Sequence, residues 1–129
     1  MATGGGAAIA TRALLGPGAA PRIAPSATVF VPVTNVLAPL VLGDGRLAGY
    51  VGFDAELEVR ADVSGSVTEK VPLLLHAINM RTYRTPLAAG RDGTLPDIAG
   101  LRAVIAAGAE EAFGVGVVRR IAITRAEPA

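Results

Sequence analysis

The chain has 129 residues, with twelve basic and eleven acidic side chains, a formal charge of +1 and no cysteine. This composition excludes disulfides, thiol catalysis and cysteine metal sites, and the charges lack the basic clusters that nucleic-acid binding requires. Half of the residues are hydrophobic but few are aromatic, so we expect one domain with an aliphatic core.

The first 26 residues are rich in Ala, Gly and Pro and show no sustained periodicity. We expect a flexible leader over 1–26 and a folded domain over 27–126. The leader is a poor signal peptide, because Arg12 interrupts its apolar part. The most apolar stretch, 29–42, contains Pro32 and Pro39 and falls short of the ~20 residues that a transmembrane helix needs.

Two extended segments are expected before residue 43. Val29, Val31 and Val33 share one face of the first, with Phe30 on the other, and Pro32 places this strand at an edge or a bulge. A second short piece covers 36–42. The turn signal Gly43-Asp44-Gly45 then makes a hairpin between 36–49 and 50–60 plausible.

The clearest strand signal runs from Tyr50 to Arg60. Apolar residues alternate there with small or charged ones, which indicates a strand with one buried face and one solvated face. The apolar positions are Val51, Phe53, Ala55, Leu57 and Val59.

Two helices and a last strand should follow. Residues 62–66 are expected to form a loop. Thr68 can then cap a helix over 67–80. The apolar residues on the inward side of this helix are Val67, Val71, Leu74, Leu75 and Ile78. A polar connection spans 82–96. Asp97 caps a second helix that ends at Gly114, with inward residues Ile98, Leu101, Val104, Ile105, Ala109, Ala112 and Phe113. The last strand covers 117–125.

The order strand, strand, helix, helix, strand predicts an α+β fold. Helices grouped between strands favour a small, mainly antiparallel sheet of three or four strands, with two helices packed on one face.

Asp54, Glu56 and Glu58 are the first candidates for chemistry. They lie about 7 Å apart on the solvated face, where carboxylates could act as acid and base or bind a hard cation. The favoured alternative is that they pair with arginines of a neighbouring strand, and Arg120 faces the right way for this. His76 is the single histidine, with no second His or Cys to complete a metal site, so we assign no catalytic, cofactor or metal residue.

Arg81, Tyr83 and Arg84 form a candidate partner contact at the end of the first helix. Two arginines and an aromatic residue suit an acidic partner. The alternative is that both arginines cap the helix C-terminus while Tyr83 is partly buried.

The chain from about 33 to 125 resembles the periplasmic domain of the flagellar basal-body-associated FliL family. The resemblance rests on the order of four segments: VLAPLVL, GYVGFDAELEV, KVPLLLHAIN and LRAVIAAGAEEAFGVGVVRRIAIT. It implies a stomatin-like (SPFH) fold that self-assembles into rings and supports the flagellar stator, with no catalytic residues to carry over.

We therefore expect a non-catalytic, FliL-like accessory domain that is periplasmic and membrane-associated. Its partners would be further copies of itself, a flagellar stator or another envelope protein. Two alternatives remain open. One is a small ligand-binding module or enzyme that uses the Asp54/Glu56/Glu58 face or His76, and the other is a structural subunit of a larger assembly.

Overall fold

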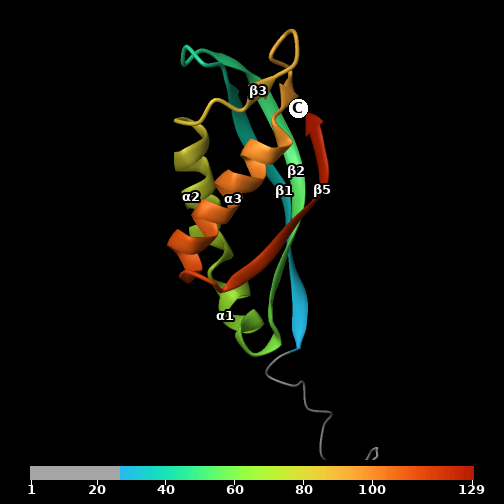
Figure 1. The fold of residues 1–129 in the computed structure, drawn as a ribbon, viewed down its shortest axis with the longest axis vertical. Coiled ribbons are helices and arrows are strands. Elements are labelled where there is room, and N and C mark those ends of the chain that lie inside the picture. Colours follow the sequence, from blue (N-terminus) through green and yellow to red (C-terminus); the bar gives the residue numbers. More distant parts are fainter. Residues whose placement is uncertain (1–26) are drawn as a thin grey trace, which may run out of the picture.

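The computed structural model describes residues 27–129, so the expected leader over 1–26 lies outside the described part. Three long strands form an antiparallel sheet in the order β1-β2-β5, and the helices lie on one face of it (Figure 1). The predicted α+β class is confirmed. The helices are three rather than two, and a small two-stranded sheet is added.

β1 (Thr28–Val41) and β2 (Leu47–Arg60) form the expected hairpin. The prediction of two short pieces before residue 43 was wrong, because β1 runs through the Thr34-Asn35 break as one strand. The register shifts between Val33 and Val36, where Asn35 adopts a φ of 56°. This bulge absorbs the irregular residues without ending the strand. Pro32 is tolerated because β1 is an edge strand.

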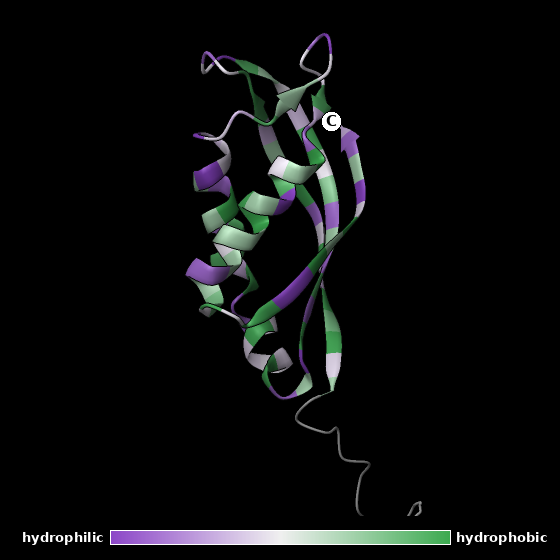
Figure 2. Ribbon diagram, in the orientation of Figure 1, coloured by the Kyte–Doolittle hydropathy of each residue, from purple (hydrophilic) through white to green (hydrophobic). Residues whose placement is uncertain are grey.

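β2 is the central strand and shows the alternation that the sequence predicts. Hydrophobic and hydrophilic residues follow one another along it (Figure 2). Its inward side chains pack beneath the helices and expose at most 1% of their surface; they are Val51, Phe53, Ala55, Leu57 and Val59. This row is the centre of the hydrophobic core.

The predicted helix over 67–80 is in fact two helices. A 3₁₀ turn, η1 (Ala61–Val63), leads into α1 (Ser64–Glu69), and α2 (Val71–Thr82) follows after Lys70. Pro72 explains the break, because its nitrogen has no hydrogen to donate to the carbonyl one turn earlier. Thr68 is not a cap, since it lies inside α1 and its hydroxyl donates to the Ser64 carbonyl.

Helical spacing also misplaced two side chains. Leu75 and Ile98 were expected inward, yet both are exposed. The segment 82–96, which was expected to be a polar connection, contributes to the buried interior. Thr82, the last residue of α2, and Leu87 are both fully buried. Two short strands, β3 (Ala88–Ala89) and β4 (Leu95–Pro96), pair within this connection.

α3 (Ile98–Phe113) starts and ends at the predicted residues. The Gly100 amide donates to the Asp97 side chain over 3.1 Å, and Gly114 ends the helix with a φ of 106°. α3 packs closely against α2 at Gly108, where an added Cβ would lie 3.4 Å from the Ala77 Cβ. The chain then returns along β2 as β5 (Val118–Pro128).

None of the helices in residues 27–129 combines the length and hydropathy that a membrane span requires.

We expect Leu57→Asp to unfold the domain, because Leu57 is 0% exposed in the middle of the core. Burying an unpaired carboxylate there costs several kcal/mol, a large part of a typical domain's stability of about 5–15 kcal/mol. Urea denaturation followed by circular dichroism measures the effect. The neighbouring change Glu56→Ser lies on the solvated face and should shift stability by less than about 0.5 kcal/mol. Equal effects of the two changes would contradict the assignment of the faces.

Candidate interaction surfaces

Asp54 is held by groups from both neighbouring strands. The Arg125 guanidinium donates to both carboxylate oxygens, with Nε 3.0 Å from Oδ2 and Nη2 3.2 Å from Oδ1. The Asn35 amide in the β1 bulge also donates to Oδ1, over 2.7 Å. These hydrogen bonds, with Arg125 the larger cause, lower the pKa of Asp54 below its ordinary value. The carboxylate therefore joins β1, β2 and β5 across the uncovered face of the sheet.

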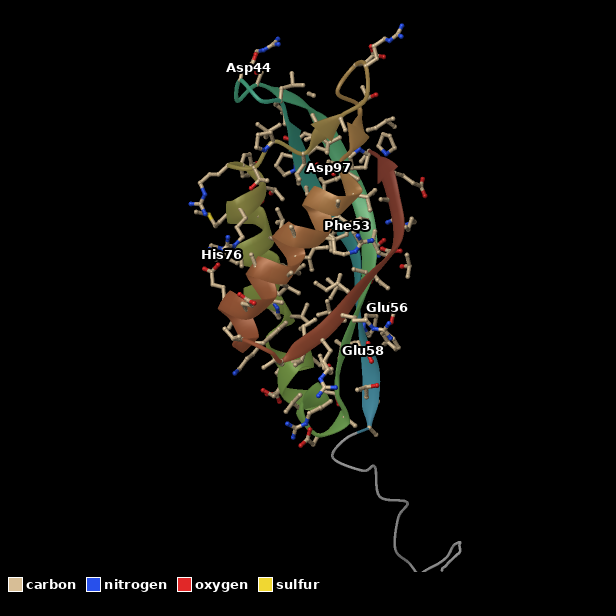
Figure 3. The ribbon with its side chains drawn as sticks, viewed as in Figure 1. Asp44, Phe53, Glu56, Glu58, His76 and Asp97 are labelled. Carbon is tan, nitrogen blue, oxygen red and sulfur yellow. The ribbon has the colours of Figure 1, made fainter. Side chains whose placement is uncertain are left out.

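Glu58 makes a second cross-strand ion pair on the same face. The Arg120 Nε lies 2.6 Å from the Glu58 Oε1, which confirms the prediction that Arg120 faces the acidic row. The hydrogen bond from Arg120 lowers the pKa of Glu58. Glu56 lies between the two pairs, opposite Pro32 and Ala122, and forms no ion pair with any described residue. Figure 3 shows Glu56 and Glu58 on the side of the sheet away from the helices.

This ionic row fits the interpretation that the acids pair with arginines. Two of the three carboxylates are engaged by arginines, and the row lies on an open sheet face rather than in a cleft. Within the described residues there is no cluster of three His, Cys, Asp or Glu side chains that could hold a metal ion. The row's visible role is to tie β5 to β2.

The two pairs give the domain a pH dependence with a definite sign. Their folded pKa values lie below the ordinary 3.8 of Asp54 and 4.5 of Glu58, so their stabilisation is complete above those values and is lost as the pH falls through the folded pKa. We expect the urea midpoint to fall below about pH 4.5 in the parent chain. Asp54→Asn should flatten this dependence, whereas Glu56→Gln should leave it unchanged. The same acid slope in all three proteins would contradict the role of Asp54.

The outward side of α2 is unusually apolar for an exposed helix. Leu73, Leu75, Met80 and Tyr83 are all exposed there, and His76 lies among them. Figure 3 shows His76 on the outer side of the helical layer. We call these five residues the α2 surface. Exposed apolar side chains gathered in this way are typical of protein–protein contacts.

The three residues predicted as a partner contact do not share one environment. Tyr83 and Arg84 are exposed at the end of α2. Arg81 is half-buried instead, with its Nη2 3.3 Å from the Glu111 Oε1 of α3. Tyr83 therefore belongs with the α2 surface, Arg84 adds positive charge at its end, and Arg81 helps to hold the two helices together.

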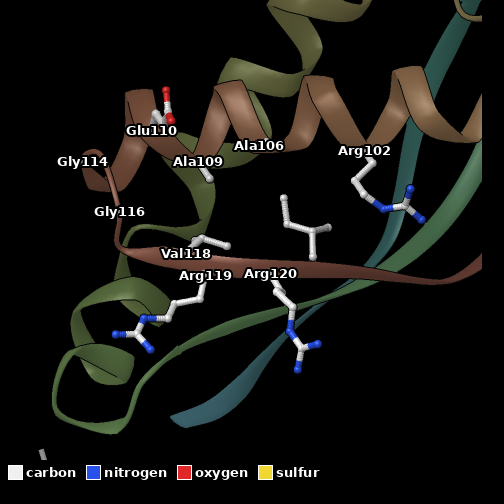
Figure 4. A pocket seen from close by; sticks show the side chains of 10 residues that line it. Arg102, Ala106, Ala109, Glu110, Gly114, Gly116, Val118, Arg119 and Arg120 are labelled. Atoms are coloured by element: carbon white, nitrogen blue, oxygen red, sulfur yellow. The ribbon is translucent and has the colours of Figure 1, made fainter. Parts of the chain in front are cut away.

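A groove of about 370 Å³ lies between the C-terminal half of α3 and the start of β5 (Figure 4). Its walls are mostly apolar, and three arginines contribute to its lining: Arg102, Arg119 and Arg120. None of the acids Asp54, Glu56 and Glu58 reaches it, and neither does His76. We call it the β5 groove.

No protein-family model, curated protein or solved structure matches this chain.

Sequence reasoning missed the breadth of the α2 surface and the whole β5 groove. Helical spacing assigned Leu75 to the core, although α2 carries apolar residues on every side, which is itself a signal that part of them must lie outside. The groove could not be found in this way, since it depends on how α3 packs beside β5.

Proposed function

We propose that this chain is a non-catalytic, FliL-like accessory domain of the cell envelope. It would act by binding further copies of itself or a membrane complex such as a flagellar stator. The observation that supports this proposal is the α2 surface, where Leu73, Leu75, Met80 and Tyr83 face solvent on one helix. Leaving such a surface in water is costly, and a partner that covers it recovers roughly 25 cal/mol for each Å² of apolar area.

The order of elements adds to this support. The segments that resemble the FliL family correspond to β1, β2, α2, and the α3–β5 unit, so the resemblance covers all the main elements of the domain. A periplasmic, membrane-associated location belongs to the same proposal, since it follows from the resemblance.

The alternative of an enzyme or ligand-binding module on the acidic face has less support. It calls for carboxylates that converge at the mouth of an apolar pocket. Asp54 and Glu58 are instead spread along a solvated sheet face and paired with arginines, while the β5 groove is lined by other residues.

The test is the association state of the purified 129-residue chain, alone and with a detergent-solubilised flagellar stator. We expect sedimentation velocity to show concentration-dependent oligomers, stator binding, or both. Leu73→Glu should weaken the association at least tenfold, since it places a charge on the covered apolar surface.

Leu37→Glu is the matched control, because Leu37 and Leu73 are similarly exposed, at 59% and 56%, on opposite faces of the domain. A monomer at every concentration that also binds no stator would contradict the proposed function. Weakening by Leu37→Glu but not by Leu73→Glu would place the contact on the sheet face and contradict the α2 surface.

A further inference from the structure

The sheet has an unpaired edge where the β5 groove lies. β5 pairs with β2 on one side only, and no backbone hydrogen bond joins residues 118–128 to any described residue outside β2. Neighbouring residues of a strand direct their amide and carbonyl groups to opposite sides, so alternate residues of β5 present both groups outward. The edge is regular over Arg120–Ile123, between the register shifts on either side.

By the usual dimensions of these elements, a layer of two helices is wider than a sheet of three strands. Two packed helices, each about 10 Å across, cover about 20 Å, whereas three strands at about 4.8 Å span only about 14 Å. α2 packs on β1, and α3 packs on β5. The groove lies between α3 and β5, next to the unpaired edge at which one further strand would pair with β5.

The β5 groove is lined by apolar side chains on one side and by charged side chains on the other. Toward α3, the groove is apolar, with Ala106 and Ala109 from the helix and Val118 and Ile121 from the strand. Figure 4 shows Arg102 reaching from α3 toward β5, whereas Arg119 and Arg120 point away from α3 and Glu110 points away from β5.

Two of the three arginines form no salt bridge within residues 27–129, although, after the hydrogen bond from Arg120, the charge of Arg119 helps to lower the pKa of Glu58. Arg120 is engaged by Glu58, but neither Arg102 nor Arg119 forms an ion pair with any residue of 27–129. A segment in the groove would thus meet an apolar surface on the side of α3 and positive charge on the other side and at the groove's end.

We propose that the β5 groove binds an extended acidic segment of a partner protein, which adds to β5 as a fourth strand. Its alternate apolar side chains pack beneath α3, and its intervening carboxylates lie beside Arg119. This is β-strand addition, in which main-chain hydrogen bonds supply affinity and the alternating side chains supply specificity. The site is separate from the α2 surface, so it stands or falls independently of the function proposed above.

Two segments of this chain could in principle occupy the groove: residues 1–26, and β5 of a second copy. Both carry positive charge, which argues against them. Residues 1–26 contain Arg12 and Arg22 and no acidic residue. The edge of a second copy would bring Arg119, Arg120 and Arg125 against the same arginines, relieved by Glu127 alone. An acidic segment is complementary instead.

The test uses the full chain and a fluorescein-labelled peptide of alternating valine and glutamate. A second peptide carries lysine in place of each glutamate. We expect fluorescence anisotropy to show saturable binding of the glutamate peptide at low salt, weakened at high salt, and no binding of the lysine peptide. In ¹⁵N NMR spectra the shifted amides should lie on β5 and α3, with α2 unaffected.

Main-chain pairing is tested with two N-methylated glutamate peptides. One is methylated at the amides on one edge of the extended peptide, and the other at the amides on the opposite edge, with identical side chains. Only the edge that faces β5 donates hydrogen bonds to it, so we expect one methylated peptide to lose binding and the other to retain it. Outward amides of Arg120–Ile123 should also exchange more slowly when the unmethylated peptide is bound.

Charge reversal at the exposed arginines completes the design. Arg102→Glu and Arg119→Glu should each weaken the glutamate peptide roughly fivefold or more, and the double variant should bind the lysine peptide instead. Arg91→Glu, an exposed change in the turn between β3 and β4, is the matched control and should leave the affinity unchanged. Circular dichroism confirms that each variant is folded.

Several results would overturn the proposal. They are equal binding of the glutamate and lysine peptides, equal binding of both methylated peptides, or shifts confined to α2. A dimer paired through β5 that the glutamate peptide does not dissociate would assign the groove to a second copy. Slow exchange of the β5 edge that is lost on deletion of residues 1–26 would assign it to the chain's own N-terminal segment.

Discussion

The architecture depends on the two-sided character of β2. Its backbone is paired on both edges, so it cannot slip by one residue without exposing Phe53 and Leu57 and burying Glu56 and Glu58. The hydrophobic effect therefore fixes which face the helices must cover, and β1 and β5 take their registers from the same strand. α2 and α3 close over this row, and Gly108 lets them approach each other closely.

Ion pairs and bulges then determine how the two edge strands, β1 and β5, are aligned with β2. The register of β1 shifts at Asn35, whose amide reaches Asp54, and the register of β5 shifts next to Arg125, whose guanidinium reaches the same carboxylate. The acidic row thus works across strands rather than toward a pocket. Exposed pairs of this kind contribute modestly to stability, but they select one register among alternatives of similar hydrophobic burial.

Two surfaces remain that the fold itself does not need. The α2 surface places apolar side chains in water. The β5 groove leaves a strand edge unpaired, and two of its arginines form no salt bridge among residues 27–129. They lie on different elements and differ in chemistry, since one is an apolar helix face and the other combines main-chain groups with positive charge. With both surfaces occupied as proposed, the domain would contact two partners at once.

By itself, the sequence determined the α+β class, the hairpin turn, the two faces of β2, the Asp97 cap and the side of the sheet on which Arg120 lies. Each of these follows from local periodicity, from turn and cap chemistry, or from the fixed alternation of a strand. Only the tertiary structure decided that β1 is continuous, that Pro72 divides the first helix and that Leu75 faces solvent. It also decided that a groove lies between α3 and β5, because the way these two elements pack depends on segments that are distant in sequence, which no local pattern records.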